Sequence, residues 1–170
     1  MTHIKLPGAK GTYVLIVSVP RLQRVAIGRL GEHDIIPGFY AYVGSAFGPG
    51  GLRARLQHHL AATARPHWHI DYLLAIAEPV EVWCAVAGWK LEQELAEMMA
   101  GSSSWRMPIP RFGASDSHRS RASHLFYSLR RPSFRRFRRQ VGAALGEPVE
   151  LDQYRVATDE PRDCGNSLRD

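Results

Sequence analysis

The sequence has few cysteines and no long apolar run. Its 170 residues include only Cys84 and Cys164, which are too few for a disulfide framework, so we expect both thiols to be reduced. No stretch approaches the roughly 18 to 20 consecutive apolar residues of a membrane span. No apolar signal core follows residues 1–5. These absences argue against a disulfide-stapled module and a membrane protein, and they predict a cytoplasmic protein without a membrane partner.

Positive charge is concentrated in one short segment. The length of 170 residues is enough for one well-buried domain, and the hydrophobic fraction of 45% and the charged fraction of 22% are typical of a soluble globular protein. Of the net charge of +6, residues 1–129 carry +4 and residues 140–170 carry −4. Residues 130–139 hold six arginines and no acidic residue. Such a segment predicts binding to a polyanion, with an affinity that falls steeply with salt. A solvated basic helix face is the simpler alternative.

The hydrophobic pattern predicts an α+β fold, with strands first and helices interleaved. β-branched runs predict strands, and apolar residues spaced by three or four predict helices. We expect the strand that ends at Gly44 to run directly into a glycine turn. The expected strands are residues 13–19, 24–30, 38–44, 80–86 and 123–129, and the expected helices are 52–60, 68–77, 89–100 and 133–145.

The chain divides into three expected parts. Residues 8–128 form the main domain, and residues 129–146 contain a basic amphipathic helix with Ser133 as its N-cap. Residues 147–170 are polar and acidic, so we expect a loosely ordered tail. The arginines expected to contact nucleic-acid phosphates on the basic helix are Arg135, Arg136, Arg138 and Arg139.

A second group of cations follows the glycine turn. Arg55 and His59 are four residues apart, so they lie on one helix face, and Arg53 is close by. Arg55 can hold a phosphate through two parallel hydrogen bonds, and His59 can orient water or protonate a leaving group. Taken without the neighbouring turn, the pair is interpreted equally well as a surface arginine and a half-buried histidine that flank Leu56.

Glu92 is the best single carboxylate for a metal ion. It lies at the edge of the apolar stripe of helix 89–100. Mg²⁺ or Mn²⁺ can be held by one carboxylate when water and phosphate complete the coordination shell. From this helix alone, the favoured interpretation of Glu92 is a surface acid that pairs with an arginine. Tyr13 and Tyr42, taken singly, are typical buried strand tyrosines whose hydroxyls find a partner in the core.

Together these residues resemble the GIY-YIG nuclease superfamily. Gly11-Thr12-Tyr13 resembles its first motif and Tyr42-Val43-Gly44 its second. The closer match is to a little-characterised bacterial and archaeal branch, whose members occur alone or fused to endonuclease III-type DNA glycosylases. The blocks that carry this match are residues 39–46, 67–74, 112–116 and 123–127.

The resemblance implies a GIY-YIG-like nuclease domain, with a small mixed or antiparallel sheet flanked by helices, that cuts DNA or RNA with one divalent cation. It implies that Tyr13 acts as the general base, or relays a proton to it, and that Tyr42 orients the attacking water. Arg55 would bind the scissile phosphate with His59 assisting, and Glu92 would hold Mg²⁺ or Mn²⁺. The glycosylase fusions favour DNA over RNA and suggest a repair protein as a partner.

This chain has 28 residues between Tyr13 and Tyr42, more than is usual in the superfamily. We expect the excess to form an extra hairpin that includes residues 23–31. The spacing of His67, His69 and Asp71 suits metal ligands on an extended segment. A helix start whose polar side chains bond to the backbone is the favoured alternative. The candidates for a supporting role are Gly11, Gly44, His67, His69, Asp71, Ser115, Asp116 and His124.

Two rival functions remain from the sequence. The first is a nucleic-acid-binding module without catalytic activity, and the second is an interaction module whose helix 133–145 docks on a protein. Asp116, His118 and His124 with nearby serines could imitate a hydrolase triad. The chain lacks the Gly-x-Ser-x-Gly elbow of such enzymes, so we disfavour serine catalysis.

Overall fold

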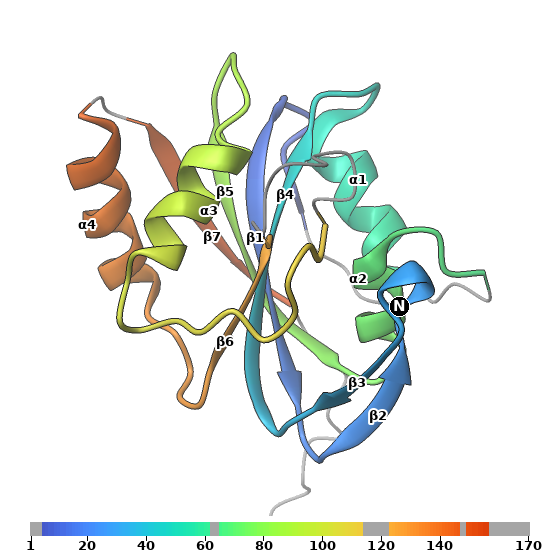
Figure 1. The fold of residues 1–170 in the computed structure, drawn as a ribbon. Coiled ribbons are helices and arrows are strands. Elements are labelled where there is room, and N and C mark those ends of the chain that lie inside the picture. The colour runs from blue at the N-terminus through green and yellow to red at the C-terminus, as the bar shows by residue number, and fades with distance from the viewer. Residues whose placement is uncertain (1–4, 62–64, 114–122, 147–148, 157–170) are drawn as a thin grey trace, which may run out of the picture.

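The fold is α+β, as expected, with an antiparallel sheet between helices (Figure 1). The computed structural model describes residues 5–61, 65–113, 123–146 and 149–156. Within these residues the five-stranded sheet has the order β6-β4-β1-β5-β7. Its strands are β1 (Gly11–Val19), β4 (Gly38–Ala46), β5 (Glu78–Val86), β6 (Leu125–Ser128) and β7 (Glu150–Arg155). The helices are α1 (Gly51–Leu60), α2 (His69–Leu74), α3 (Glu92–Ala100) and α4 (Phe134–Leu145).

β1 is the central strand, and both of its faces are buried. It pairs with β4 on one side and β5 on the other, so that Tyr13 lies opposite Gly44 and Cys84. A strand covered on both faces needs a nearly continuous apolar run, which residues 13–17 supply. Because side chains alternate, Tyr13 belongs to the core beneath α1 and α2, whereas Val14 belongs to the core beneath α3 and α4.

Each helix covers one face of the sheet through an apolar stripe. Leu52 and Leu56 of α1 are fully buried on the Tyr13 face. On the opposite face, Phe137 of α4 packs with its ring 4.7 Å from that of Trp83 on β5. α4 begins with the expected cap, since Ser133 Oγ accepts the backbone N–H of Arg136. None of the helices in the described residues is long and apolar enough to span a membrane.

The segment between β1 and β4 forms an added hairpin, but its strands differ from the expected ones. We expected a strand over residues 24–30, and this is wrong beyond Ala26. β2 (Gln23–Ala26) pairs with β3 (Glu32–Ile35) in a separate two-stranded sheet, with a 3₁₀ turn, η1 (Gly28–Leu30), between them. Gly28 has a φ of +47°, outside the range of a strand.

The turn expected at Gly44 lies later in the chain. β4 continues through Gly44 to Ala46, and the backbone turns at Gly50 and Gly51, whose φ angles are +80° and +56°. A Cβ on Gly51 would lie 2.3 Å from the Ala9 carbonyl oxygen, so this position also requires glycine. Gly44 is therefore a strand residue, and its role is different from the one that we predicted.

The acidic tail contributes a strand to the sheet. We predicted a loosely ordered tail over residues 147–170, and this is wrong for Glu150–Arg155, which form β7. β7 pairs with the edge of β5, where Gln153 lies opposite Trp83 and donates a hydrogen bond to the buried Glu81 carboxylate. Leu151 packs against the core beneath α3 and α4, and Tyr154 packs against the core that contains Tyr13, so this edge strand contacts both cores.

We predict that Phe137→Ala lowers the free energy of unfolding by about 3–5 kcal/mol, because it removes a buried ring from the core beneath α4. Urea denaturation would measure the change. Arg138→Ala, on the exposed side of the same helix, should stay within about 0.5 kcal/mol of the parent. Equal, small effects of both substitutions would show that α4 does not belong to the core.

Candidate functional site

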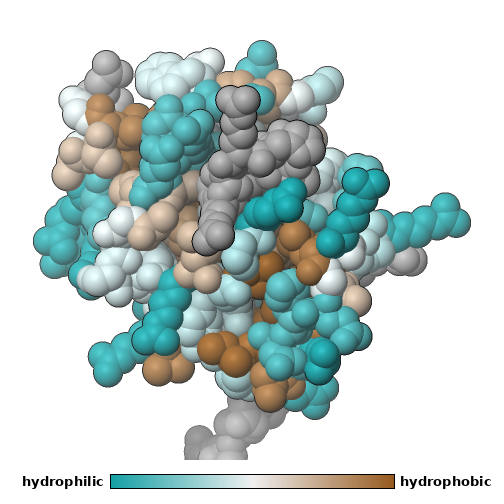
Figure 2. All heavy atoms as spheres, in the orientation of Figure 1, coloured by the Kyte–Doolittle hydropathy of each residue, from teal (hydrophilic) through white to brown (hydrophobic). Residues whose placement is uncertain are grey.

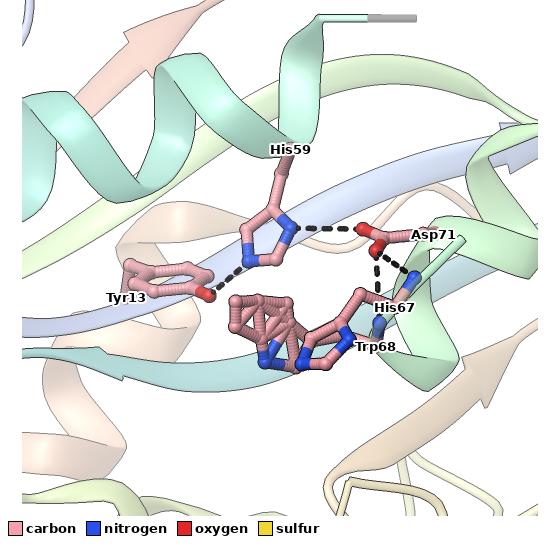
Figure 3. A network of polar contacts seen from close by, with 5 residues as sticks. All are labelled: Tyr13, His59, His67, Trp68 and Asp71. Atoms are coloured by element: carbon pink, nitrogen blue, oxygen red, sulfur yellow. Dashed lines mark hydrogen bonds and ion pairs between the residues drawn. The ribbon is translucent and has the colours of Figure 1, made fainter. Parts of the chain in front are cut away.

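Tyr13, His59 and Asp71 form a chain of buried hydrogen bonds (Figure 3). The Tyr13 hydroxyl lies 2.9 Å from His59 Nε2, and His59 Nδ1 lies 3.2 Å from Asp71 Oδ1. The three residues come from β1, from the end of α1 and from the first turn of α2. Their exposed fractions are 2%, 5% and 3%, so the chain is shielded from water.

Asp71 is held in place by the start of its own helix. Its Oδ2 accepts the backbone N–H groups of His67 and Trp68, both at 2.9 Å (Figure 3). Burial alone would raise the pKa of Asp71, but these two bonds and the bond from His59 hold it below its ordinary value. Asp71 is therefore an ionised acceptor, and the favoured interpretation of residues 67–71 as a helix start is confirmed.

The ionised Asp71 decides which nitrogen of His59 carries the proton. Burial lowers the pKa of His59, and the Asp71 hydrogen bond and charge only partly offset this effect. The ring is neutral at neutral pH, and since a carboxylate can only accept, Nδ1 bears the hydrogen. Nε2 is left as an acceptor, so the Tyr13 hydroxyl donates to it. His59 can take a proton from Tyr13, and Asp71 stabilises the imidazolium that results.

Tyr42 and Arg55 lie beside this chain. The Tyr42 ring centroid is 6.3 Å from those of Tyr13 and His59. The Arg55 guanidinium lies 4.5 Å from the ring centroid of Trp68, in a cation–π contact. Burial raises the pKa of both tyrosines above the ordinary value, whereas the charge of Arg55 acts in the opposite direction on both. Both phenols are thus protonated at neutral pH, next to a cation that can bind an anion.

Glu92 reaches the same place from α3. Its Oε1 lies 2.9 Å from His124 Nδ1, and its side chain is 24% exposed. Burial acts to raise the pKa of Glu92, but hydrogen bonds with His124 and Ser45 hold it below the ordinary value. The charge of Glu92 acts on both Tyr13 and Tyr42. Glu92 is therefore an ionised, accessible carboxylate near the tyrosines, paired with a histidine instead of the arginine that we considered.

The close approach of the Tyr13 phenol requires glycine at position 44. A Cβ on Gly44 would lie 2.5 Å from the Tyr13 hydroxyl oxygen and 2.6 Å from Cζ. Gly11, at the start of β1, is equally constrained, because its Cβ would lie 2.4 Å from the Ala85 carbonyl oxygen. Both glycines support the site by giving room to neighbouring groups.

The remaining predicted residues have other contacts. His69 Nδ1 accepts the backbone N–H of Gly113 at 3.0 Å, which ties α2 to the segment before β6. The His67 ring packs edge-on against Trp68, at 4.6 Å between centroids. Arg53 is exposed, but its Nε donates to the Leu6 carbonyl oxygen, so it anchors the N-terminal segment. Ser115 and Asp116 lie outside the described residues.

The four arginines of α4 lie away from this site. Arg135, Arg136, Arg138 and Arg139 are exposed on a helix that covers the sheet face opposite to Tyr13 (Figure 1).

Two residues of the site, Trp68 and Ser45, were not predicted from the sequence. Trp68 lies within the polar block 67–71, and its contact with Arg55 depends on the packing of α2 against α1. Ser45 is a strand residue of β4, and its hydrogen bond with Glu92 depends on where α3 lies against the sheet. Neither contact has a signal in the local pattern, because each joins two separate elements.

The described residues of the site supply only some of the ligands that a divalent metal ion needs. Within the described residues there is no cluster of three or more histidine, cysteine or acidic side chains that could enclose an ion. Glu92 offers one ionised carboxylate, which fits a Mg²⁺-type ion that also binds water and a phosphate. The arrangement therefore combines a guanidinium that can bind an anion, an ionised carboxylate that can bind a metal ion and a buried chain along which a proton can move.

The chain belongs to the family described as Domain of unknown function DUF123, whose model matches residues 12–147. The matched span runs from β1 through α4. It includes the basic helix and the site residues Tyr13, Tyr42, Arg55, His59, Asp71 and Glu92. No curated protein and no solved structure matches the chain. What the site does must therefore be argued from its own geometry and chemistry.

We predict that Gly44→Ala lowers the free energy of unfolding by about 1–3 kcal/mol, because its Cβ overlaps the buried Tyr13 ring. Urea denaturation of Gly44→Ala and Gly48→Ala would measure the difference. A Cβ at Gly48 meets nothing within 4 Å, so this control should remain close to the parent. A Gly44→Ala protein as stable as the control would contradict the assigned role of Gly44.

Proposed function

We propose that this member of the DUF123 family is a metal-dependent endonuclease, related to the GIY-YIG nucleases, that hydrolyses phosphodiester bonds of nucleic acid. The observation that carries the proposal is the meeting of Arg55, Glu92 and the buried Tyr13–His59–Asp71 chain, from four separate elements of the fold. Phosphodiester hydrolysis needs these three capacities: anion binding, charge stabilisation and activation of water.

Arg55 is the group that would bind the scissile phosphate. A guanidinium can donate two parallel hydrogen bonds to phosphoryl oxygens, and its charge matches the diester. Its contact with Trp68 fixes the guanidinium plane and reduces the rotamer freedom that would be lost on binding. Glu92 would hold the divalent cation, Mg²⁺ or Mn²⁺. When bound, that cation would neutralise charge that develops on the phosphoryl and leaving oxygens.

Tyr13 would activate water without becoming a stable phenolate. Its raised pKa excludes a useful phenolate population at neutral pH, so it must lose its own proton as it takes one from water. His59 Nε2 is placed to receive that proton at 2.9 Å. The proton passes from water to Tyr13 and from Tyr13 to His59, and Asp71 compensates the new charge. Tyr42, at the edge of this chain, would orient the water.

The rival proposal is a nucleic-acid-binding module with no catalytic activity. The exposed arginines of α4 support it, because they lie on the sheet face opposite to Tyr13 and bind phosphate without needing the site. DNA is our preferred substrate class, and a repair protein our preferred partner, on the strength of the sequence resemblance alone.

We predict Mg²⁺- or Mn²⁺-dependent cleavage of at least one member of a labelled panel of duplex, single-stranded, branched and abasic DNA and RNA. Glu92→Gln should reduce cleavage at least about hundredfold while binding in the absence of metal changes little, because one carboxylate charge is lost from the metal ligand. Glu94→Gln, exposed on the same helix, is the matched control and should cleave normally.

Loss of cleavage in Glu92→Gln and Arg55→Ala, with activity retained in Glu94→Gln, would support the nuclease. Salt-sensitive binding without cleavage of any substrate by the parent would favour the binding module instead.

We predict a pH–rate profile whose acid limb lies below the ordinary histidine pKa of about 6.5, because His59 must be neutral to accept a proton and burial lowers its pKa. Asp71 acts to raise that pKa, so Asp71→Asn should move the limb to lower pH. The plateau rate should fall by about ten- to hundredfold, since the imidazolium loses its counter-charge.

The measurement is kcat/KM from pH 4.5 to 9 for the parent and Asp71→Asn. A purely structural role for Asp71 predicts a lower rate with an unmoved acid limb, which would overturn the proton path.

A further inference from the structure

A basic pocket lies between the end of β6, the connection after α3 and the start of α4. It has a volume of about 530 Å³, within the range of small-molecule sites. Its walls are residues 103–106, residues 127–133 and the first two turns of α4, with Ile36 and Trp83. In Figure 1 these segments are the connection after α3, the end of β6 and the start of α4. The Tyr13–His59–Asp71 chain contributes no residue to it.

Every charged residue that lines this basic pocket in the described chain is an arginine. Arg106, Arg130, Arg131 and Arg136 are all exposed, and no acidic side chain belongs to the lining. Arg131 is partly compensated by Glu81, at 3.7 Å. The other three have no such acidic neighbour among the described ion pairs. Three or four guanidinium groups around one hollow repel one another, and an anion with several oxygens removes that repulsion.

The pocket also offers aromatic surface. The rings of Trp83, Trp105, Tyr127 and Phe137 line it. Trp105 is the half-buried ring among them, the other three are buried, and Leu129 is 74% exposed. The surface in the orientation of Figure 1 mixes hydrophilic and hydrophobic residues in its lower part (Figure 2). An inorganic anion would use the arginines alone. A ligand that joins an anionic group to a flat ring uses both.

The lining of the pocket also contains a buried hydrogen-bond donor, the indole N–H of Trp83. Trp83 is 1% exposed, and its Nε1–H has no hydrogen-bond partner among the described residues. An indole N–H withdrawn from water without an acceptor is destabilising, so most are paired. A ligand in the pocket that carries an acceptor beside its ring would satisfy this group.

We propose that this pocket binds a nucleotide unit, with its phosphate on the arginines and its base against the aromatic wall. The unit could be a free mononucleotide or one nucleotide of a strand, because both present the same phosphate and ring. The proposal goes beyond the nuclease function and does not depend on it, since the two sites share no residue.

The test is a titration without divalent metal, followed by tryptophan fluorescence and by calorimetry. The probes are 5′-mononucleotides, a short single-stranded oligodeoxynucleotide and inorganic phosphate. Arg136→Ser removes a lining arginine, and Arg135→Ser removes its exposed neighbour outside the pocket, with the same change of charge. Trp83→Phe keeps a ring in the core and deletes the N–H. Urea denaturation checks that each variant is folded.

We expect Arg136→Ser to weaken nucleotide binding at least tenfold, Trp83→Phe to weaken it severalfold, and Arg135→Ser to change it less than twofold. Binding of mononucleotides identifies a free ligand, and binding of the oligonucleotide alone identifies a strand. Equal losses in Arg135→Ser and Arg136→Ser would overturn the proposal, because they indicate diffuse charge. Binding of phosphate as tight as that of nucleotide, or no binding of any probe, would overturn it as well.

Glu92→Gln serves as a separate control. Nucleotide binding should be unchanged in this variant, whether or not cleavage is detected. A failure of the proposed nuclease activity and a failure of the nucleotide pocket therefore give different results.

Discussion

The buried chain from Asp71 through His59 to Tyr13 is the interaction on which the candidate site depends. Two backbone N–H groups fix Asp71, Asp71 selects the tautomer of His59, and His59 fixes the Tyr13 hydroxyl. Because all three side chains are nearly withdrawn from water, loss of one member leaves another polar group buried and unpaired. The same bonds join β1, α1 and α2. The protonation of the three side chains and the packing of this face of the sheet therefore depend on the same contacts.

Positively charged side chains lie on both faces of the sheet. Arg55 lies with the buried chain on one face, whereas the arginines of residues 130–139 lie with α4 on the other. The strongest electrostatic signal in the sequence therefore does not mark the proposed catalytic site. It marks a face with its own pocket, where an aromatic wall and a buried indole N–H add features that net charge alone cannot indicate.

Elements with a strong local pattern were predictable, and those defined by pairing were not. The run of residues 13–19 and the leucine spacing of residues 52–60 identified β1 and α1 nearly to the residue. The hairpin strand over residues 24–30 was misjudged, because Gly28 takes a conformation that alternation of side chains does not report. β7 was missed, because a polar edge strand is stabilised by its partner β5 and not by its own composition.

The sequence by itself determined the α+β class and the basic segment, and it supplied the candidate groups for chemistry: two tyrosines, an arginine, a histidine and a glutamate. Only the tertiary structure decided that Asp71 belongs with them, that Gly44 makes room for the Tyr13 ring and that Glu92 pairs with His124. Periodicity reports which residues are buried, because burial follows the repeat of one helix or strand. It cannot report which buried groups meet across 46 residues of chain, as Tyr13 and His59 do, because that contact is set by how separate elements pack.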